Sequence, residues 1–225
     1  MRKLILIIVL LSANTLLAQK KFKLDPSSFI IGLFNDYNGR QVPLDNPKEA
    51  TYLTYFYCSQ KQVRSVFLDS INKYFNDDDF VFEQRTIYSK SLSKHFNSYY
   101  KINKDEDYGT TIDEVDYFYY SMKLKTKSFQ TNDKKVSFIL GSFILSGAKE
   151  NGEFQIRMAN SASHYDALLA FFKFLKFQYK ANELCDTCMP TVQSVSFVPT
   201  SEYLSIFINA KIPETNYSDC DKNGL

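Results

Sequence analysis

The segment VSFILGSFIL at residues 136–145 lies between two segments whose side chains alternate in polarity. Before it, residues 116–126 (DYFYYSMKLKT) place Phe118, Tyr120, Met122 and Leu124 on one face of an extended chain. After it, residues 153–158 (EFQIRM) alternate without a break. A segment that is apolar on both faces is typical of a central strand. The three segments together predict an antiparallel meander of three strands.

Helical spacing predicts two main helices, over residues 60–75 and 163–179, and the second begins with the capping pattern of Ser163 and Asp166. We expect further strands at 29–34 and 80–88, a hairpin of 192–198 with 203–210, and a long loop over 97–115. Residues 47–57 fit either a helical piece or a strand, and Pro43 belongs at a sheet edge. The predicted fold class is α+β: one domain over residues 19–212, mainly antiparallel sheet with two main helices packed on it, and a polar tail over 213–225.

Residues 1–18 (MRKLILIIVLLSANTLLA) have the order of a secretory signal peptide. Arg2 and Lys3 precede eight apolar residues, and Ala18 supplies a small residue before the expected cut. Eight residues are too few to cross a bilayer, and no later apolar run is long enough to do so. The leader is typical of an exported bacterial protein, located in the periplasm, in the outer envelope or outside the cell, with a retained signal anchor as the alternative.

The balance of charges argues against a nucleic-acid partner. The chain has 27 basic and 25 acidic residues, and Arg2 and Lys3 of the leader account for the whole excess. A domain that binds nucleic acid usually keeps a clear basic surplus. We therefore expect the mature chain to bind neither DNA nor RNA.

Few residues are suited to catalysis. The chain has two histidines, and it lacks the zinc-protease pattern H-E-x-x-H, the G-x-S-x-G nucleophile turn and a dinucleotide fingerprint. His164 is the better catalytic candidate, because a helix N-terminus favours a neutral imidazole that can act as a base. A lone histidine at a helix start is more often structural. No cofactor is expected.

An acidic segment resembles part of a calcium-binding loop. Asn103, Asp105, Asp107 and Glu114 occupy positions 1, 3, 5 and 12 of an EF-hand pattern. Tyr108 stands where that loop needs glycine, so a solvated acidic loop is the default interpretation. Asp105, Asp107 and Glu114 remain the candidate calcium ligands.

Four cysteines follow the leader: Cys58, Cys185, Cys188 and Cys220. An even number in an exported chain indicates structural disulfides, and four cysteines allow three pairings. Cys185 and Cys188 form a C-x-x-C that could instead be a redox couple or half of a zinc site. The predicted helix before the motif presents its negative end to these thiols, which disfavours the redox alternative.

Aromatic residues are abundant, with 20 Phe and 16 Tyr. Because aromatic side chains dominate interface energetics, we expect an exported, non-enzymatic domain that binds a protein, a glycan or an apolar ligand. The alternative is a hydrolase of an unrecognised family that uses His164 or paired carboxylates.

Overall fold

The computed structural model describes residues 22–36, 39–44, 51–75, 80–83, 85–112, 115–150, 152–185 and 192–214. Side chains at 105–108, 110–112, 115–117, 162 and 183–185 are outside this description. Residues 1–18, the predicted signal peptide, and most of the predicted polar tail lie outside the described residues.

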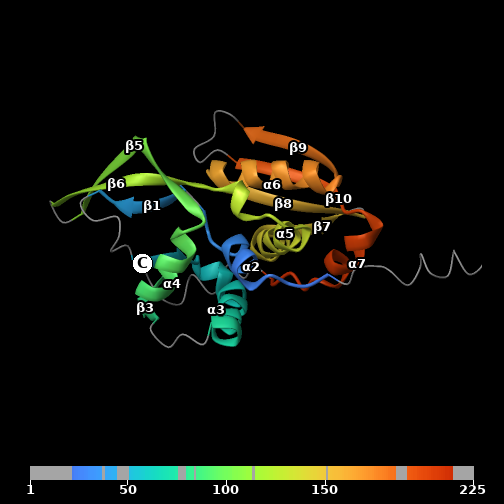
Figure 1. The fold of residues 1–225 in the computed structure, drawn as a ribbon, viewed down its shortest axis with the longest axis horizontal. Coiled ribbons are helices and arrows are strands. Elements are labelled where there is room, and N and C mark those ends of the chain that lie inside the picture. Colours follow the sequence, from blue (N-terminus) through green and yellow to red (C-terminus); the bar gives the residue numbers. More distant parts are fainter. Residues whose placement is uncertain are drawn as a thin grey trace, which may run out of the picture.

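The predicted α+β class with antiparallel sheets and a single domain is confirmed (Figure 1). The described elements are, in chain order, α2 (Pro26–Gly32), β1 (Arg40–Pro43), β2 (Tyr52–Tyr55), η1 (Cys58–Gln60), α3 (Lys61–Phe75), β3 (Val81–Glu83), β4 (Thr86–Tyr88), α4 (Lys90–Asn97), β5 (Tyr100–Ile112), β6 (Val115–Leu124), η2 (Thr126–Ser128), α5 (Asn132–Ser146), β7 (Gly147–Glu150), β8 (Glu153–Ala159), α6 (Ala162–Leu175), β9 (Gln178–Cys185), β10 (Val192–Val198) and α7 (Ser201–Asn209).

Three antiparallel sheets have the strand orders β1-β6-β5, β7-β8-β10-β9 and β2-β4-β3. We call the first two sheet 1 and sheet 2. Sheet 1 lies at the left in Figure 1 and sheet 2 at the upper right, with α2 and α5 near the centre of the molecule. β1 is an edge strand, so the position predicted for Pro43 is confirmed.

The molecule has two similar halves. The order α2, β1, α4, β5, β6 is followed by α5, β8, α6, β9, β10, and the sheet order β1-β6-β5 corresponds to β8-β10-β9. Residues 44–89 add η1, α3 and the third sheet to the first half. This structural repeat was missed in the sequence, where the two halves share few residues.

The two halves meet where α2 crosses α5. A Cβ atom added at Gly32 would lie 2.2 Å from the carbonyl oxygen of Phe138, and one added at Gly141 would lie 2.2 Å from that of Phe29. Only glycine on both helices permits such a close approach of the backbones. The crossing therefore fixes how the halves, and the sheets they carry, are joined.

The predicted three-stranded meander is wrong, because Val136–Leu145 lies within the helix α5. Thr131 caps this helix by accepting a hydrogen bond from the backbone N–H of Lys134. Helix α5 packs on α2, and its Phe143 also contacts the aromatic rings of sheet 2 and α7. A helix surrounded on several sides needs apolar residues all round, so it lacks the 3.6-residue period.

Three other predicted elements are also corrected. Residues 29–34 belong largely to α2, which Asp25 caps and Pro26 begins, rather than to a strand. Residues 203–210 lie largely in helix α7, with Tyr203 and Phe207 buried one turn apart, so the predicted hairpin is absent and β10 pairs with β8 and β9. The predicted loop over 97–115 contains the whole of strand β5.

The predicted helices over 60–75 and 163–179 correspond to α3 and α6. Helix α6 covers the inner face of sheet 2, where the ring of Phe172 stacks on that of Phe197 with centroids 4.7 Å apart. Most of the 20 phenylalanines are buried in the core, so the aromatic surplus serves packing rather than a surface. No helix in the described part of the chain is long and apolar enough to cross a membrane.

Candidate functional site

The outer face of sheet 1 carries a row of hydrogen-bonding side chains. Ser121 of β6 is opposite Gln41 of β1 on one side and opposite Asn103 of β5 on the other. Directly opposed residues of a sheet point to the same face, and this row alternates with the buried Val42 and Met122. The row therefore faces away from the core.

Two lysines adjoin this row. Lys101 and Lys123 are opposite each other on the same outer face, and both are exposed. The outer face thus combines polar side chains of β1, β5 and β6 with two positive charges.

Sheet 2 repeats the arrangement. Ser194 of β10 is opposite Arg157 of β8 and Asn182 of β9, while Ser196 is opposite Lys180. The buried Ile156 and Val195 point the other way, toward the helices. Each sheet therefore has a central serine with an asparagine beside it, and a lysine two residues before that asparagine.

The repeat is visible in the sequence once the fold is known. Residues 100–103 read Tyr-Lys-Ile-Asn at the start of β5, and residues 179–182 read Tyr-Lys-Ala-Asn at the start of β9. Each segment follows a helix, α4 or α6. This short repeat was the available signal for the site.

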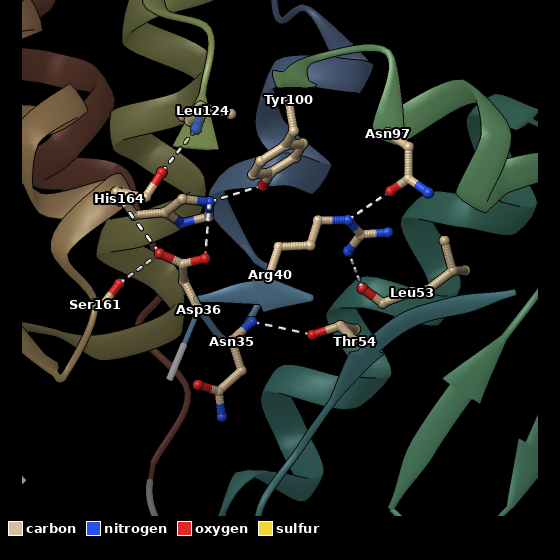
Figure 2. A network of polar contacts seen from close by, with 11 residues as sticks. Asn35, Asp36, Arg40, Leu53, Thr54, Asn97, Tyr100, Leu124, Ser161 and His164 are labelled. Atoms are coloured by element: carbon tan, nitrogen blue, oxygen red, sulfur yellow. Dashed lines mark hydrogen bonds and ion pairs between the residues drawn. The ribbon is translucent and has the colours of Figure 1, made fainter. Parts of the chain in front are cut away.

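Beneath these faces lies a buried polar network that connects the two halves (Figure 2). Asp36, just after α2, accepts hydrogen bonds from the Ser161 hydroxyl at 3.0 Å and from the His164 backbone N–H at 3.2 Å. The His164 Nε2 atom is 3.8 Å from the second carboxylate oxygen of Asp36 and 2.8 Å from the Tyr100 hydroxyl. Asp36 and Tyr100 belong to the first half, and Ser161 and His164 belong to the second.

Arg40 extends the polar core of the first half. Its guanidinium donates to Asn97 Oδ1 and to the Leu53 carbonyl, both at 2.6 Å, and to the Tyr52 carbonyl at 2.9 Å. It also lies 5.4 Å from the ring centroid of Tyr100. These contacts tie β1 to β2 and α4.

Burial determines the protonation of this core. Burial lowers the pKa of His164, against the opposing effect of the Asp36 carboxylate. Burial likewise lowers the pKa of Arg40 and raises the pKa of Tyr100 well above 10. His164 is therefore a neutral imidazole near pH 7.

The structure places the catalytic candidate His164 in the core, with 0% of its surface exposed. It meets Asp36 and Tyr100 but no solvent, so it has no open path to a substrate. The side chains of the calcium candidates Asp105, Asp107 and Glu114 lie outside the described residues, and that site stays a prediction. Cys58 is disulfide-bonded. The side chains of Cys185, Cys188 and Cys220 are outside the description, so the pairing also stays a prediction.

No protein-family model and no curated protein matches the sequence. Solved structures do match the fold. A variant of I-DmoI in complex with its target DNA, in the presence of magnesium, has a TM-score of 0.50 and 12% identity, over 83% of this chain and 97% of that chain. Mesophilic variants of the homing endonuclease I-DmoI have a TM-score of 0.47 and 12% identity, over 82% of this chain and 94% of that chain. I-DmoI in complex with DNA and manganese has a TM-score of 0.47 and 13% identity, over 84% of this chain and 97% of that chain.

This likeness is one of fold, and it requires corrections to the sequence predictions. The expected exported, non-enzymatic domain for a protein, glycan or apolar ligand is contradicted, as is its hydrolase alternative with His164 or paired carboxylates. The expected absence of a nucleic-acid partner is contradicted because the similar structure is a DNA complex. The expected location in the periplasm, in the outer envelope or outside the cell is contradicted on the same ground.

Total charge is a poor guide to a nucleic-acid partner, for a physical reason. A balanced total averages over the whole surface, whereas binding depends on the charges of one face. Lys101 and Lys123 lie together on sheet 1, and the balanced total does not reveal this grouping.

Proposed function

We propose that this chain binds double-stranded DNA along the outer faces of sheet 1 and sheet 2. The observation that carries the proposal is the matched lysine and asparagine of the two sheets, Lys101 with Asn103 and Lys180 with Asn182. The I-DmoI structure of similar fold, which contains target DNA, also supports DNA as the partner.

The residue types suit a duplex. Lysine neutralises phosphates and supplies affinity without reading sequence. Asparagine and glutamine side chains present the paired donor and acceptor that adenine requires in the major groove, and arginine suits guanine. Strands as well as helices enter that groove. Gln41 and Arg157, at equivalent positions, then differ in the base they favour.

The first test measures affinity for duplexes two helical turns long, selected from a randomised library, by fluorescence anisotropy at several salt concentrations. Lys101→Ala and Lys180→Ala should each weaken binding to all duplexes and lower the slope of log K against log salt by about 0.9. Lys173→Ala is the control, because Lys173 is exposed on α6 and not on a sheet. Equal affinities for the three variants and the parent chain would refute the proposal.

A second measurement separates recognition of the DNA sequence from electrostatic affinity for the duplex. Asn103→Ala and Asn182→Ala should each reduce discrimination between the selected duplex and a scrambled one, by about 1–3 kcal/mol. The salt slope should stay unchanged, since neither residue is charged. Loss of affinity for both duplexes alike would instead assign these residues a role in sheet structure.

A further inference from the structure

A cavity of about 170 Å³ lies where α2 and α5 end beside sheet 2. Its lining comes from both halves and includes Asp36 of the first half and Ser146, Arg157, Met158 and Ser161 of the second. The two helices therefore direct their C-terminal ends toward one small space. Because such ends carry partial negative charge, the space could attract a cation.

The structure of similar fold was obtained in the presence of magnesium, which raises the question whether this cavity could hold divalent ions. These ions require several oxygen ligands, with carboxylates among them. Among the described lining residues, Asp36 is the one carboxylate, and Arg157 adds a positive charge to the wall. No group of three or more His, Cys, Asp or Glu side chains that could hold a metal occurs within the described ranges.

The carboxylate of Asp36 already has protein partners. One oxygen accepts the Ser161 hydroxyl and the His164 backbone N–H, and the other faces the His164 imidazole. Ser161 is the N-cap residue of α6, yet its side chain makes no capping hydrogen bond within that helix. Asp36 performs the capping instead, from the other half of the molecule, where the helix N-terminus favours an anion.

Helix α5 supplies no carboxylate to the cavity either. Its last residue is Ser146, whose hydroxyl donates to the Ser142 carbonyl, and Gly147 follows. Arg157, which also lines the cavity, forms an ion pair with Glu150 at 3.6 Å on the surface. The described walls thus offer a divalent cation one carboxylate that is already bonded, hydroxyls, amides and a repelling guanidinium.

We infer that this cavity is not a divalent-cation site, and that Asp36 is a positioning residue that caps α6 from the opposite half. The inference goes beyond DNA binding, because it concerns the metal alone and can be tested without a duplex. It also predicts that magnesium does not strengthen binding to a duplex, since it acts there only as a competing counterion.

The experiment adds Mn²⁺ alone to the full chain carrying ¹³C-labelled methionine methyl groups. Mn²⁺ is paramagnetic and broadens the signals of nearby nuclei, and Met158 lines the cavity while Met122 lies in sheet 1. We expect the Met158 signal to broaden no more than that of Met122. Selective, saturable broadening of Met158 would overturn the inference whether or not the chain binds DNA.

Asp36→Asn tests the capping role, with Asp69→Asn on the exposed side of α3 as the control. Asp36→Asn should lower the melting temperature and lower the pKa of His164 in an NMR titration, because the carboxylate raises that pKa. Any weak Mn²⁺ affinity should be equal in both variants. A tenfold loss of Mn²⁺ affinity confined to Asp36→Asn, or a His164 pKa that does not move, would refute the assignment. If Asp36→Asn fails to fold, the Met158 measurement on the parent chain decides the metal question.

Discussion

The close crossing of α2 and α5 predicts that a glycine-to-alanine substitution within α5 lowers the stability of the chain, the opposite of its usual effect in a helix. Gly141 lies in the interior of α5, where alanine normally stabilises a helix by about 1 kcal/mol. At this position the new Cβ would lie 2.2 Å from the Phe29 carbonyl oxygen and 3.0 Å from the Gly32 Cα atom. Gly141→Ala should therefore destabilise the chain.

The magnitude follows from what must move. Ordinary contact begins near 3.4 Å, so the helices have to separate by about 1 Å. Both atoms belong to the backbone and cannot rotate away. The loss of stability is therefore at or above the upper end of the range for overpacked cores, about 3 kcal/mol. After the gain in helix propensity, the net loss is about 2 kcal/mol, equivalent to a fall in melting temperature of about 4–8 °C for a chain of this size.

Urea and thermal unfolding followed by circular dichroism measure this loss directly. Gly109→Ala is the control, since Gly109 is exposed in β5. A Cβ atom added there would first meet the side chain of Phe118, at 3.3 Å, and not backbone. A Gly141→Ala chain as stable as the parent, or more stable, would show that the two helices do not approach as closely as described. The joining of the two halves would then need another explanation.

Three further predictions concern the core. Burial lowers the pKa of His164 below the ordinary 6.5, so that as the pH falls the unfolded chain binds a proton on this histidine before the folded chain does. The contribution of His164 to the free energy of unfolding should therefore be complete above about pH 6.5 and decrease below it. In urea titrations at several pH values, His164→Gln should reduce this dependence of the unfolding free energy on pH. Arg40→Ala should lower the free energy of unfolding in urea by at least about 3 kcal/mol, because it leaves the Leu53 and Tyr52 carbonyls without their charged donor. A loss below about 1 kcal/mol would contradict the network. Phe197→Ala should cost about 3–5 kcal/mol by the same assay, whereas a value near that of a surface substitution would contradict its position in the aromatic core.

Elements with a clear period could be predicted from the sequence, and elements that are buried on several sides could not. The alternation of residues 153–158 indicated a strand, and β8 is one, with Phe154 and Ile156 buried. The apolar run of residues 136–145 has no period because α5 is surrounded. Its length of ten residues, which favours a buried helix over a buried strand, was the signal that could have identified it. Helix α7 was missed because its residues favour strands, while packing of Tyr203 and Phe207 on the core favours a helix.

The polar site depends on register, which no single segment reveals. Lys101 and Asn103 lie on one outer face because β5 pairs with β6 in a particular alignment, and a shift by one residue would turn both toward the core. Asp36 and His164 are 128 residues apart in the sequence and meet because Gly32 and Gly141 let the helices cross closely. Residue types alone suggested a catalytic histidine, while its surroundings make His164 part of the connection between halves. The same crossing relates the face of Lys101 and Asn103 to the face of Lys180 and Asn182, so a substitution that opens the helix pair should weaken the proposed DNA binding without touching either face.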